Sequence, residues 1–249
     1  MHTAAVTTVR LDIEYDGSEF SGWARQPDLR TVQGELEVAL ATVLREPVEL
    51  VVAGRTDAGV HACGQVASFA TRTGMPDALA QRLNGVAPDD VAVVAAEEVP
   101  TGFDARRDAT SRSYLYRVLP RGAPGPFERG RALWWPHRLD RAALAACAAA
   151  LPGTHDFTAF TPTQTDHVRF ERQVLAAEWS WEEPIACFRI SADAFMHNMV
   201  RVLVGTMLEV ANDRRGIEDF HRLLAGAPRC QAGETAPAHG LYLESVSYD

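Results

Sequence analysis

The stretch "AGRTDAGVHA" occupies residues 53–62 and separates two apolar segments that both have the character of β-strands. Two glycines, Gly54 and Gly59, supply permissive backbone angles, and Asp57 can bend the chain through hydrogen bonds to nearby amides. One interpretation is therefore a tight turn. The other is that two strands hold Asp57 and Arg55 at the end of a sheet, where the carboxylate and the guanidinium act on a substrate.

The sequence around this loop predicts the order strand, helix, strand, strand, helix, strand. Apolar and polar residues alternate over 9–15, as is typical of a half-buried strand. Thr31 can cap a helix whose apolar residues recur at helical spacing as far as Leu44. The remaining predicted elements of this half are strands over 48–53, 65–70 and 91–99 and a helix over 76–83.

The second half of the chain repeats this order. Its predicted strands cover 113–119, 174–181, 185–192 and 241–248, and its predicted helices cover 141–151, 195–211 and 217–224. This is the ferredoxin-like order. We therefore expect an α+β fold of two ferredoxin-like (βαββαβ) halves, residues 1–108 and 109–249, whose antiparallel sheets flank a central cleft.

Bulk composition restricts the class of protein. The chain has 249 residues with 47% hydrophobic content, enough for one large or two modest cores. Neither a signal peptide nor an apolar run of the roughly 20 residues that span a membrane is recognisable, so we expect a cytoplasmic protein. The four cysteines lack the paired spacing of a zinc or redox site.

Charge is unevenly distributed along the chain. The net charge is -9, yet residues 101–140 contain 8 arginines against 4 acidic residues. All 24 basic residues are arginines, which a coding bias explains and which also suits bidentate contact with phosphates. The uneven distribution leaves an arginine patch available for contact with phosphates despite the acidic total.

Two long segments, 121–136 and 155–172, show no clear period and are expected to be loops. The first contains three prolines, three arginines and the pair Trp134-Trp135. Packing of these tryptophans against the sheet is favoured over stacking on nucleic-acid bases, and both interpretations stay open.

Seven segments resemble, in order, those of the tRNA pseudouridine synthase A (TruA) family. The loop at 53–62 is similar to the family's signature loop, and the resemblance extends over essentially the whole chain. The other segments are "EYDGSEFSGWARQP" near the start, "GQVASF" at 64–69, "FDARRDATSRSYLY" at 103–116, "HDFTAF" at 155–160, "FMHNMVR" at 195–201 and "TAPAHGLYL" at 235–243.

This resemblance implies the pseudouridine synthase fold and an isomerase that usually acts as a homodimer. The implied reaction converts uridine to pseudouridine at positions 38 to 40 in the anticodon stem and loop of tRNA, with no cofactor and no metal. Asp57 matches the family's essential aspartate. A carboxylate suits this chemistry because positive charge develops at C1' of the sugar when the bond to N1 breaks. Nucleophilic attack by Asp57 and removal of a sugar proton both remain open.

Three further residues match family positions with assigned roles. Arg201 matches the arginine that pairs with the aspartate, and Arg55 matches the arginine that extrudes the target nucleotide and holds its phosphate. Tyr114 matches the tyrosine that stacks on the flipped base, whose extrusion costs a few kcal/mol. Tyr116 lies two residues further along the same strand, and for it we expect core packing.

Three other functions are compatible with parts of the sequence. A ferredoxin-like sheet can bind RNA without chemistry, although no run of sheet aromatics like that of RNA-recognition domains is present. A synthase with the same chemistry could act on a different RNA. A metal-dependent hydrolase could use Asp57 and His61, which lie four residues apart, but a third ligand at a recognisable spacing is missing.

Overall fold

The computed structural model describes residues 6–164 and 168–248, so residues 165–167 of the predicted loop at 155–172 lie outside the described residues. The chain divides into two compact units. Unit 1 comprises the residues up to Thr110 together with those from Leu243 onward, and unit 2 comprises Ser111–Tyr242. Within the described ranges, no helix combines the length and the apolar character that crossing a membrane requires.

Unit 1 has the βαββαβ order that the sequence predicts. Strand β1 is followed by α1, β2, β3, α2 and β4, and a short 3-10 helix, η1, comes after β1. Antiparallel pairing places β1 between β4 and β3, and β2 pairs with β3. The bounds are Thr7–Tyr15 for β1, Gly17–Glu19 for η1, Val32–Leu44 for α1, Val51–Val52 for β2, His61–Thr71 for β3, Leu79–Asn84 for α2 and Val91–Val99 for β4.

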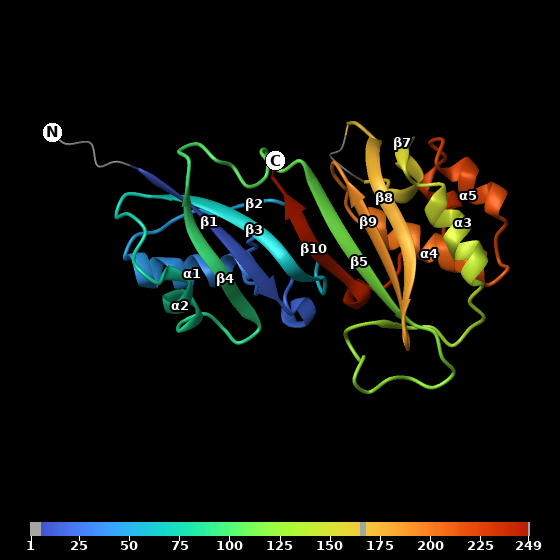
Figure 1. Ribbon diagram of the computed structural model, residues 1–249, viewed down its shortest axis with the longest axis horizontal. Coiled ribbons are helices and arrows are strands. Elements are labelled where there is room, and N and C mark those ends of the chain that lie inside the picture. Colours follow the sequence, from blue (N-terminus) through green and yellow to red (C-terminus); the bar gives the residue numbers. More distant parts are fainter. Residues whose placement is uncertain (1–5, 165–167, 249) are drawn as a thin grey trace. The chain divides into compact units, whose positions relative to one another are not determined.

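Side-chain patterning explains these elements. The alternate residues Val9, Leu11 and Ile13 of β1 are buried, as period-two alternation requires of a strand with one face in the core. Thr31 caps α1, since its hydroxyl oxygen accepts a hydrogen bond from the Gly34 amide at 3.3 Å. The buried side chains of α1 recur at helical spacing, and α1 and α2 pack against each other beside the sheet (Figure 1).

The strands β5, β9, β8 and β7 of unit 2 pair in that order, each pair antiparallel, and the short β6 is parallel to β5. Helices α3, α4 and α5 pack together in this unit (Figure 1). The strands are β5 Ser111–Leu119, β6 Leu133–Trp134, β7 Gly153–Asp156, β8 Glu171–Glu182 and β9 Ile185–Ala192. The helices are α3 Arg141–Ala149, α4 Met199–Ala211 and α5 Ile217–Leu223, with 3-10 helices η2 Thr158–Phe160, η3 Arg229–Gln231 and η4 Ala238–Gly240.

The last strand differs from the expected division of the chain. Strand β10, Leu241–Ser247, is the neighbour of β3, and residues from Leu243 onward belong to unit 1 rather than to a second half over 109–249. The backbones approach closely there: a Cβ atom on Gly64 would lie 2.3 Å from the Glu244 carbonyl oxygen. Sequence order alone does not reveal this return to the first unit.

The predicted α+β class is confirmed, with differences at element ends. Strand β3 begins at His61 rather than at residue 65, and β2 covers only two residues of the predicted strand 48–53. Helix α4 begins at Met199 rather than at residue 195, because Asn198 has a left-handed backbone with φ of 61° that a right-handed helix cannot contain.

Candidate active site

The loop over 53–60 connects β2 to β3 in unit 1, and main-chain hydrogen bonds define both of its ends. The Ala53 amide donates to the Val66 carbonyl at 2.9 Å and so continues the β2–β3 pairing by one residue. At the other end, the Val60 amide donates to the Asp57 carbonyl at 3.1 Å, and Gly59 has a φ of 78°. The chain therefore turns sharply just after Asp57, in a conformation that favours glycine.

Thr56 anchors the middle of this loop. Its side chain is buried, and its hydroxyl lies 2.7 Å from the hydroxyl of Tyr15, at the end of β1. Its carbonyl accepts a hydrogen bond from the Trp23 amide at 3.0 Å. Burial raises the pKa of Tyr15 to about 12, with hydrogen bonds to Thr56 and Gln65 opposing the rise. The Tyr15 hydroxyl is therefore protonated at neutral pH.

Gln65 of β3 connects Tyr15 to the start of the loop. Its side-chain amide nitrogen donates to the Gly54 carbonyl at 2.8 Å and to the Tyr15 hydroxyl at 3.3 Å. Gln65 is fully buried, so each of these polar contacts replaces a hydrogen bond to water. We name Tyr15, Thr56 and Gln65 the anchor cluster.

The segment after β1 packs tightly against the same loop. A Cβ atom on Gly17 would lie 2.0 Å from the Val60 carbonyl oxygen, a distance that no side chain can occupy. The Gly17 amide donates to Nδ1 of the buried His61 at 3.1 Å, and an Asp16 carboxylate oxygen lies 3.1 Å from the same nitrogen. His61 thus ties the end of the loop to residues 16–17 through Nδ1.

Arg55 and Asp57 flank the anchored Thr56. Arg55 is exposed, and its guanidinium makes no hydrogen bond or ion pair with any residue in the described ranges. Asp57 is half-buried. A buried residue held from two sides therefore separates a carboxylate from a guanidinium that is accessible to an anionic ligand.

Tyr114 and Tyr116 lie on β5 in unit 2 and differ in their surroundings. The Tyr114 ring packs edge-on against Phe195 with 4.9 Å between the ring centroids, and 8% of the residue is exposed. Tyr116 is fully buried and its hydroxyl donates to the Pro237 carbonyl at 2.8 Å. Burial raises the pKa of Tyr116, and the Arg201 cation opposes this rise. The core-packing prediction for Tyr116 is confirmed.

Arg201 lies in the first turn of α4 and is oriented by its own hydrogen bonds. Its Nε donates to the Ala236 carbonyl at 2.7 Å, and its Nη1 donates to the Asn198 side-chain oxygen at 2.8 Å. The Ala236 amide in turn donates to the Arg201 carbonyl at 3.1 Å. The left-handed Asn198 thus both starts the helix and fixes the arginine.

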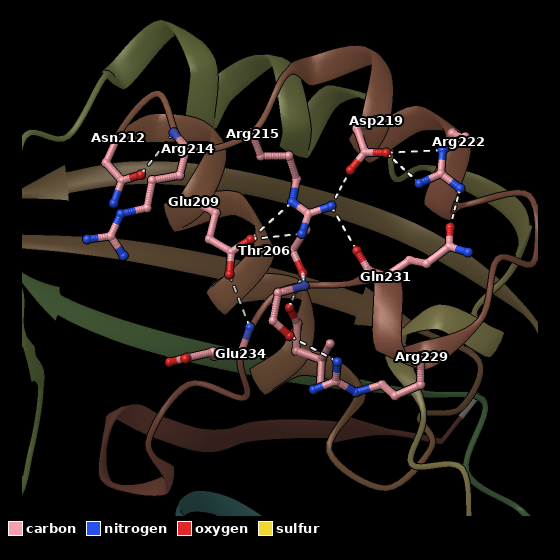
Figure 2. A network of polar contacts seen from close by, with 12 residues as sticks. Thr206, Glu209, Asn212, Arg214, Arg215, Asp219, Arg222, Arg229, Gln231 and Glu234 are labelled. Carbon is pink, nitrogen blue, oxygen red and sulfur yellow. Dashed lines mark hydrogen bonds and ion pairs between the residues drawn. The ribbon is translucent and has the colours of Figure 1, made fainter.

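A strap of residues 233–236 lies along α4 and supports this arrangement (Figure 2). The Gly233 amide donates to the Thr206 hydroxyl at 3.0 Å, and the Glu234 amide donates to Glu209 at 3.2 Å. The other carboxylate oxygen of Glu209 accepts from Arg215 at 2.9 Å, and Arg215 also pairs with Asp219 of α5. The strap is thereby linked to both helices, which keeps the Ala236 carbonyl in place for Arg201.

The predicted site residues form two pairs. Arg55 and Asp57 lie in one loop of unit 1. In unit 2, Tyr114 contacts Phe195, and Arg201 lies in the same segment over 195–201. The anchor cluster was missed by sequence reasoning, because a threonine between two charged residues carries no periodic signal.

Comparisons with known proteins identify the family of this chain. A family profile described as tRNA pseudouridine synthase matches residues 13–107 and 147–249. Curated proteins named tRNA pseudouridine synthase A are similar to the chain over nearly its whole length. That of Frankia casuarinae is 44% identical and covers 99% of this chain and 91% of the relative, and that of Bacillus pumilus is 40% identical and covers 97% and 99%. That of Acetivibrio thermocellus is 38% identical and covers 96% and 99%.

The fold, the loop and these matches define an isomerase of the pseudouridine synthase class. The chain belongs to the tRNA pseudouridine synthase family. RNA binding without chemistry and metal-dependent hydrolysis therefore do not describe this protein.

Proposed function

We propose that this enzyme converts uridine to pseudouridine at positions 38 to 40 in the anticodon stem and loop of tRNA. The observation that carries the proposal is the anchored loop, in which Thr56 is held by Tyr15 and by the Trp23 amide while Asp57 and Arg55 flank it. The choice of positions rests on the resemblance of the seven ordered segments to the TruA family and on relatives named tRNA pseudouridine synthase A.

Asp57 is the proposed catalytic carboxylate. The C1'–N1 bond of the uridine breaks, the freed uracil rotates, and a new bond joins C1' to C5. The C5 proton is then lost and N1 acquires a proton, so no water is consumed and no second carboxylate is needed, in contrast to glycoside hydrolysis. Asp57 acts either as the nucleophile at C1' or as the base that removes a sugar proton.

Arg201 is proposed to pair with Asp57 and keep the carboxylate ionised when the substrate excludes water. Two of its nitrogens already donate to Ala236 and Asn198, so the guanidinium is held in one orientation. A lysine could not reproduce this planar arrangement of donors.

Arg55 and Tyr114 are proposed to hold the target nucleotide. Arg55 is exposed without a described partner and binds the phosphate, while Tyr114, fixed edge-on by Phe195, provides the surface against which the extruded base stacks. An extruded base loses its stacking neighbours, and an aromatic ring replaces part of that stabilisation.

The proposal assigns the aspartate loop to the N-terminal half and Tyr114 with Arg201 to the C-terminal half of the enzyme. The resemblance also supports a cytoplasmic homodimer that needs neither cofactor nor metal. Sedimentation analysis of the purified protein tests the dimer, and full activity after treatment with a chelator is expected.

Mapping the modified uridines tests the choice of substrate. The enzyme is incubated with transcripts of one tRNA that carry uridine at only one of positions 38, 39 and 40, and with a transcript that carries none there. Pseudouridine is expected in the first three and absent from the fourth. Modification of the fourth transcript, or of an unrelated RNA at a comparable rate, would overturn the anticodon stem-loop assignment while leaving the reaction itself intact.

A further inference from the structure

Unit 2 contains a pocket that the site residues do not explain. The loop between β5 and β6 is the yellow-green segment that follows β5 in Figure 1. Its residues line an open pocket with a volume of about 500 Å³. Leu119 and Ala132 line its apolar part, Arg129 and Trp134 lie at its edge, and His239 contributes from η4. The volume lies in the range of sites that bind small ligands.

The walls of this pocket are fixed by the fold of unit 2. Ala132 packs in a small buried cluster with Leu119, Ile185 and Cys187. Main-chain hydrogen bonds close the loop, with the Glu128 amide donating to Gly125 at 3.2 Å and the Ala132 amide donating to Glu128 at 3.0 Å. The pocket is therefore formed before any ligand binds.

Trp134 presents an aromatic surface at the edge of the pocket. Its indole nitrogen donates to the Arg121 carbonyl at 2.9 Å, and its main chain pairs with Leu119 of β5. The orientation of the ring is thus restrained, although 41% of the residue is exposed. Packing explains the buried part of this tryptophan and leaves its exposed part without a structural role.

Positive charge accompanies this aromatic surface. Arg129 is exposed and pairs with no residue that the structure describes. The acidic lining residue Glu128 is neutralised by Arg117 at 3.0 Å. An accessible guanidinium beside an exposed indole suits a ligand that combines a planar ring with a phosphate.

The pocket also lies near Arg201. Burial lowers the pKa of His239, the Arg201 cation lowers it further, and hydrogen bonding to the Ala132 main chain opposes the change. His239 is therefore a neutral polar group in the pocket at pH 7. It connects the pocket to the part of unit 2 that holds the proposed partner of Asp57.

We propose that this pocket binds one unstacked nucleotide of the tRNA other than the target uridine, with its base against Trp134 and its phosphate on Arg129. The inference rests on the proposed function. It adds a second base-binding surface to that of Tyr114, so that the enzyme holds the target and another nucleotide separately. Unstacked bases of RNA are commonly held against aromatic side chains in this way.

Steady-state kinetics on an anticodon stem-loop RNA provide the first test. For Trp134→Ala we expect KM to rise about tenfold while kcat stays within about twofold, since stacking on an aromatic ring contributes on this scale per base. Trp134→Phe should restore most of the affinity. Arg129→Gln should raise KM and reduce the salt dependence of binding by about one phosphate contact. Arg214→Gln is the matched control: it removes one exposed charge of the same unit, and KM should not change.

Fluorescence provides a readout that does not need turnover. The stem-loop RNA should quench the tryptophan emission of the wild type more than that of Trp134→Phe, since stacking acts on the exposed indole. Equal quenching in both proteins, together with an unchanged KM for Trp134→Ala and Arg129→Gln, would overturn the pocket assignment and leave the proposed function intact. Greater quenching in the wild type than in Trp134→Phe, without any pseudouridine formation by the wild type, would instead contradict the proposed function and support the pocket.

Discussion

The two units position their site residues by different means. In unit 1, the buried Thr56 between Arg55 and Asp57 bears the hydrogen bonds that fix the loop. In unit 2, Arg201 is fixed by hydrogen bonds from its own guanidinium to Ala236 and Asn198. A substitution of Thr56 should therefore displace Asp57 in unit 1. In unit 2, the position of Arg201 depends on the hydrogen-bonding groups of Arg201 itself.

One feature is common to both regions: a glycine allows two backbones to touch. A Cβ atom would lie 2.0 Å from the Val60 carbonyl oxygen at Gly17 and 1.9 Å from the Glu234 carbonyl oxygen at Gly205. Gly205 lies within α4, where alanine is ordinarily stabilising by up to about 1 kcal/mol. Close approach, and not helix propensity, determines the residue at that position.

Substitution of these glycines should have the largest effect on stability. Gly17→Ala and Gly205→Ala are each expected to lower the free energy of unfolding by about 3 kcal/mol or more, because backbone must move to admit the methyl group. Gly216→Ala is the control, since nothing lies within 4 Å of its added Cβ. Denaturant unfolding measures the difference. A Gly205→Ala protein as stable as Gly216→Ala would show that the strap is not held tightly against α4.

Apart from substitution of Asp57, substitution of Arg201 should give the largest loss of kcat. Arg201→Lys keeps the charge but loses the Nε and Nη1 donors, and we expect kcat to fall about a hundredfold through misplacement of the cation. Guanidinium added to an Arg201→Ala protein should restore part of the kcat that this variant loses. The control substitution Arg214→Lys should leave kcat at the wild-type value. Full turnover by Arg201→Lys would mean that its charge alone matters and that the orienting hydrogen bonds do not.

Thr56 should show a smaller effect, confined to kcat. Thr56→Val removes the contact with Tyr15 while keeping the shape of the side chain, and kcat is expected to fall about tenfold with KM little changed because Asp57 is displaced. Thr56→Ser should recover most of the loss. If Thr56→Val raised KM and left kcat intact, the anchor cluster would serve substrate binding instead of positioning the aspartate.

Tyr15 gives the anchor cluster a pH signature. Its folded pKa of about 12 exceeds the ordinary value of 10.0, so the stability that this difference contributes is complete below pH 10 and is lost as the pH rises towards 12. We expect the free energy of unfolding to fall more steeply over this range in the wild type than in Tyr15→Phe. Parallel pH profiles for the two proteins would contradict the burial of the Tyr15 hydroxyl.

The sequence predicts the fold better than it predicts what holds the site. Alternation in β1 and helical spacing in α1 follow directly from burial and could be read without a structure. The start of α4 could not, because the spacing of apolar residues does not reveal the left-handed backbone of Asn198 or its contact with Arg201. The return of β10 to unit 1 and the contact of Thr56 with Tyr15 both join residues distant in sequence, for which local patterning carries no signal.

The role of Asp57 is the central claim, and release of tritium from tRNA labelled at C5 of uridine tests it most directly. Only the formation of the C1'–C5 bond expels that atom. We predict release by the wild type and none above background by Asp57→Asn, which keeps the size of the side chain and should bind tRNA and unfold like the wild type. Release by Asp57→Asn at the wild-type rate would contradict the account, because the anchored loop would then present a carboxylate that the reaction does not use.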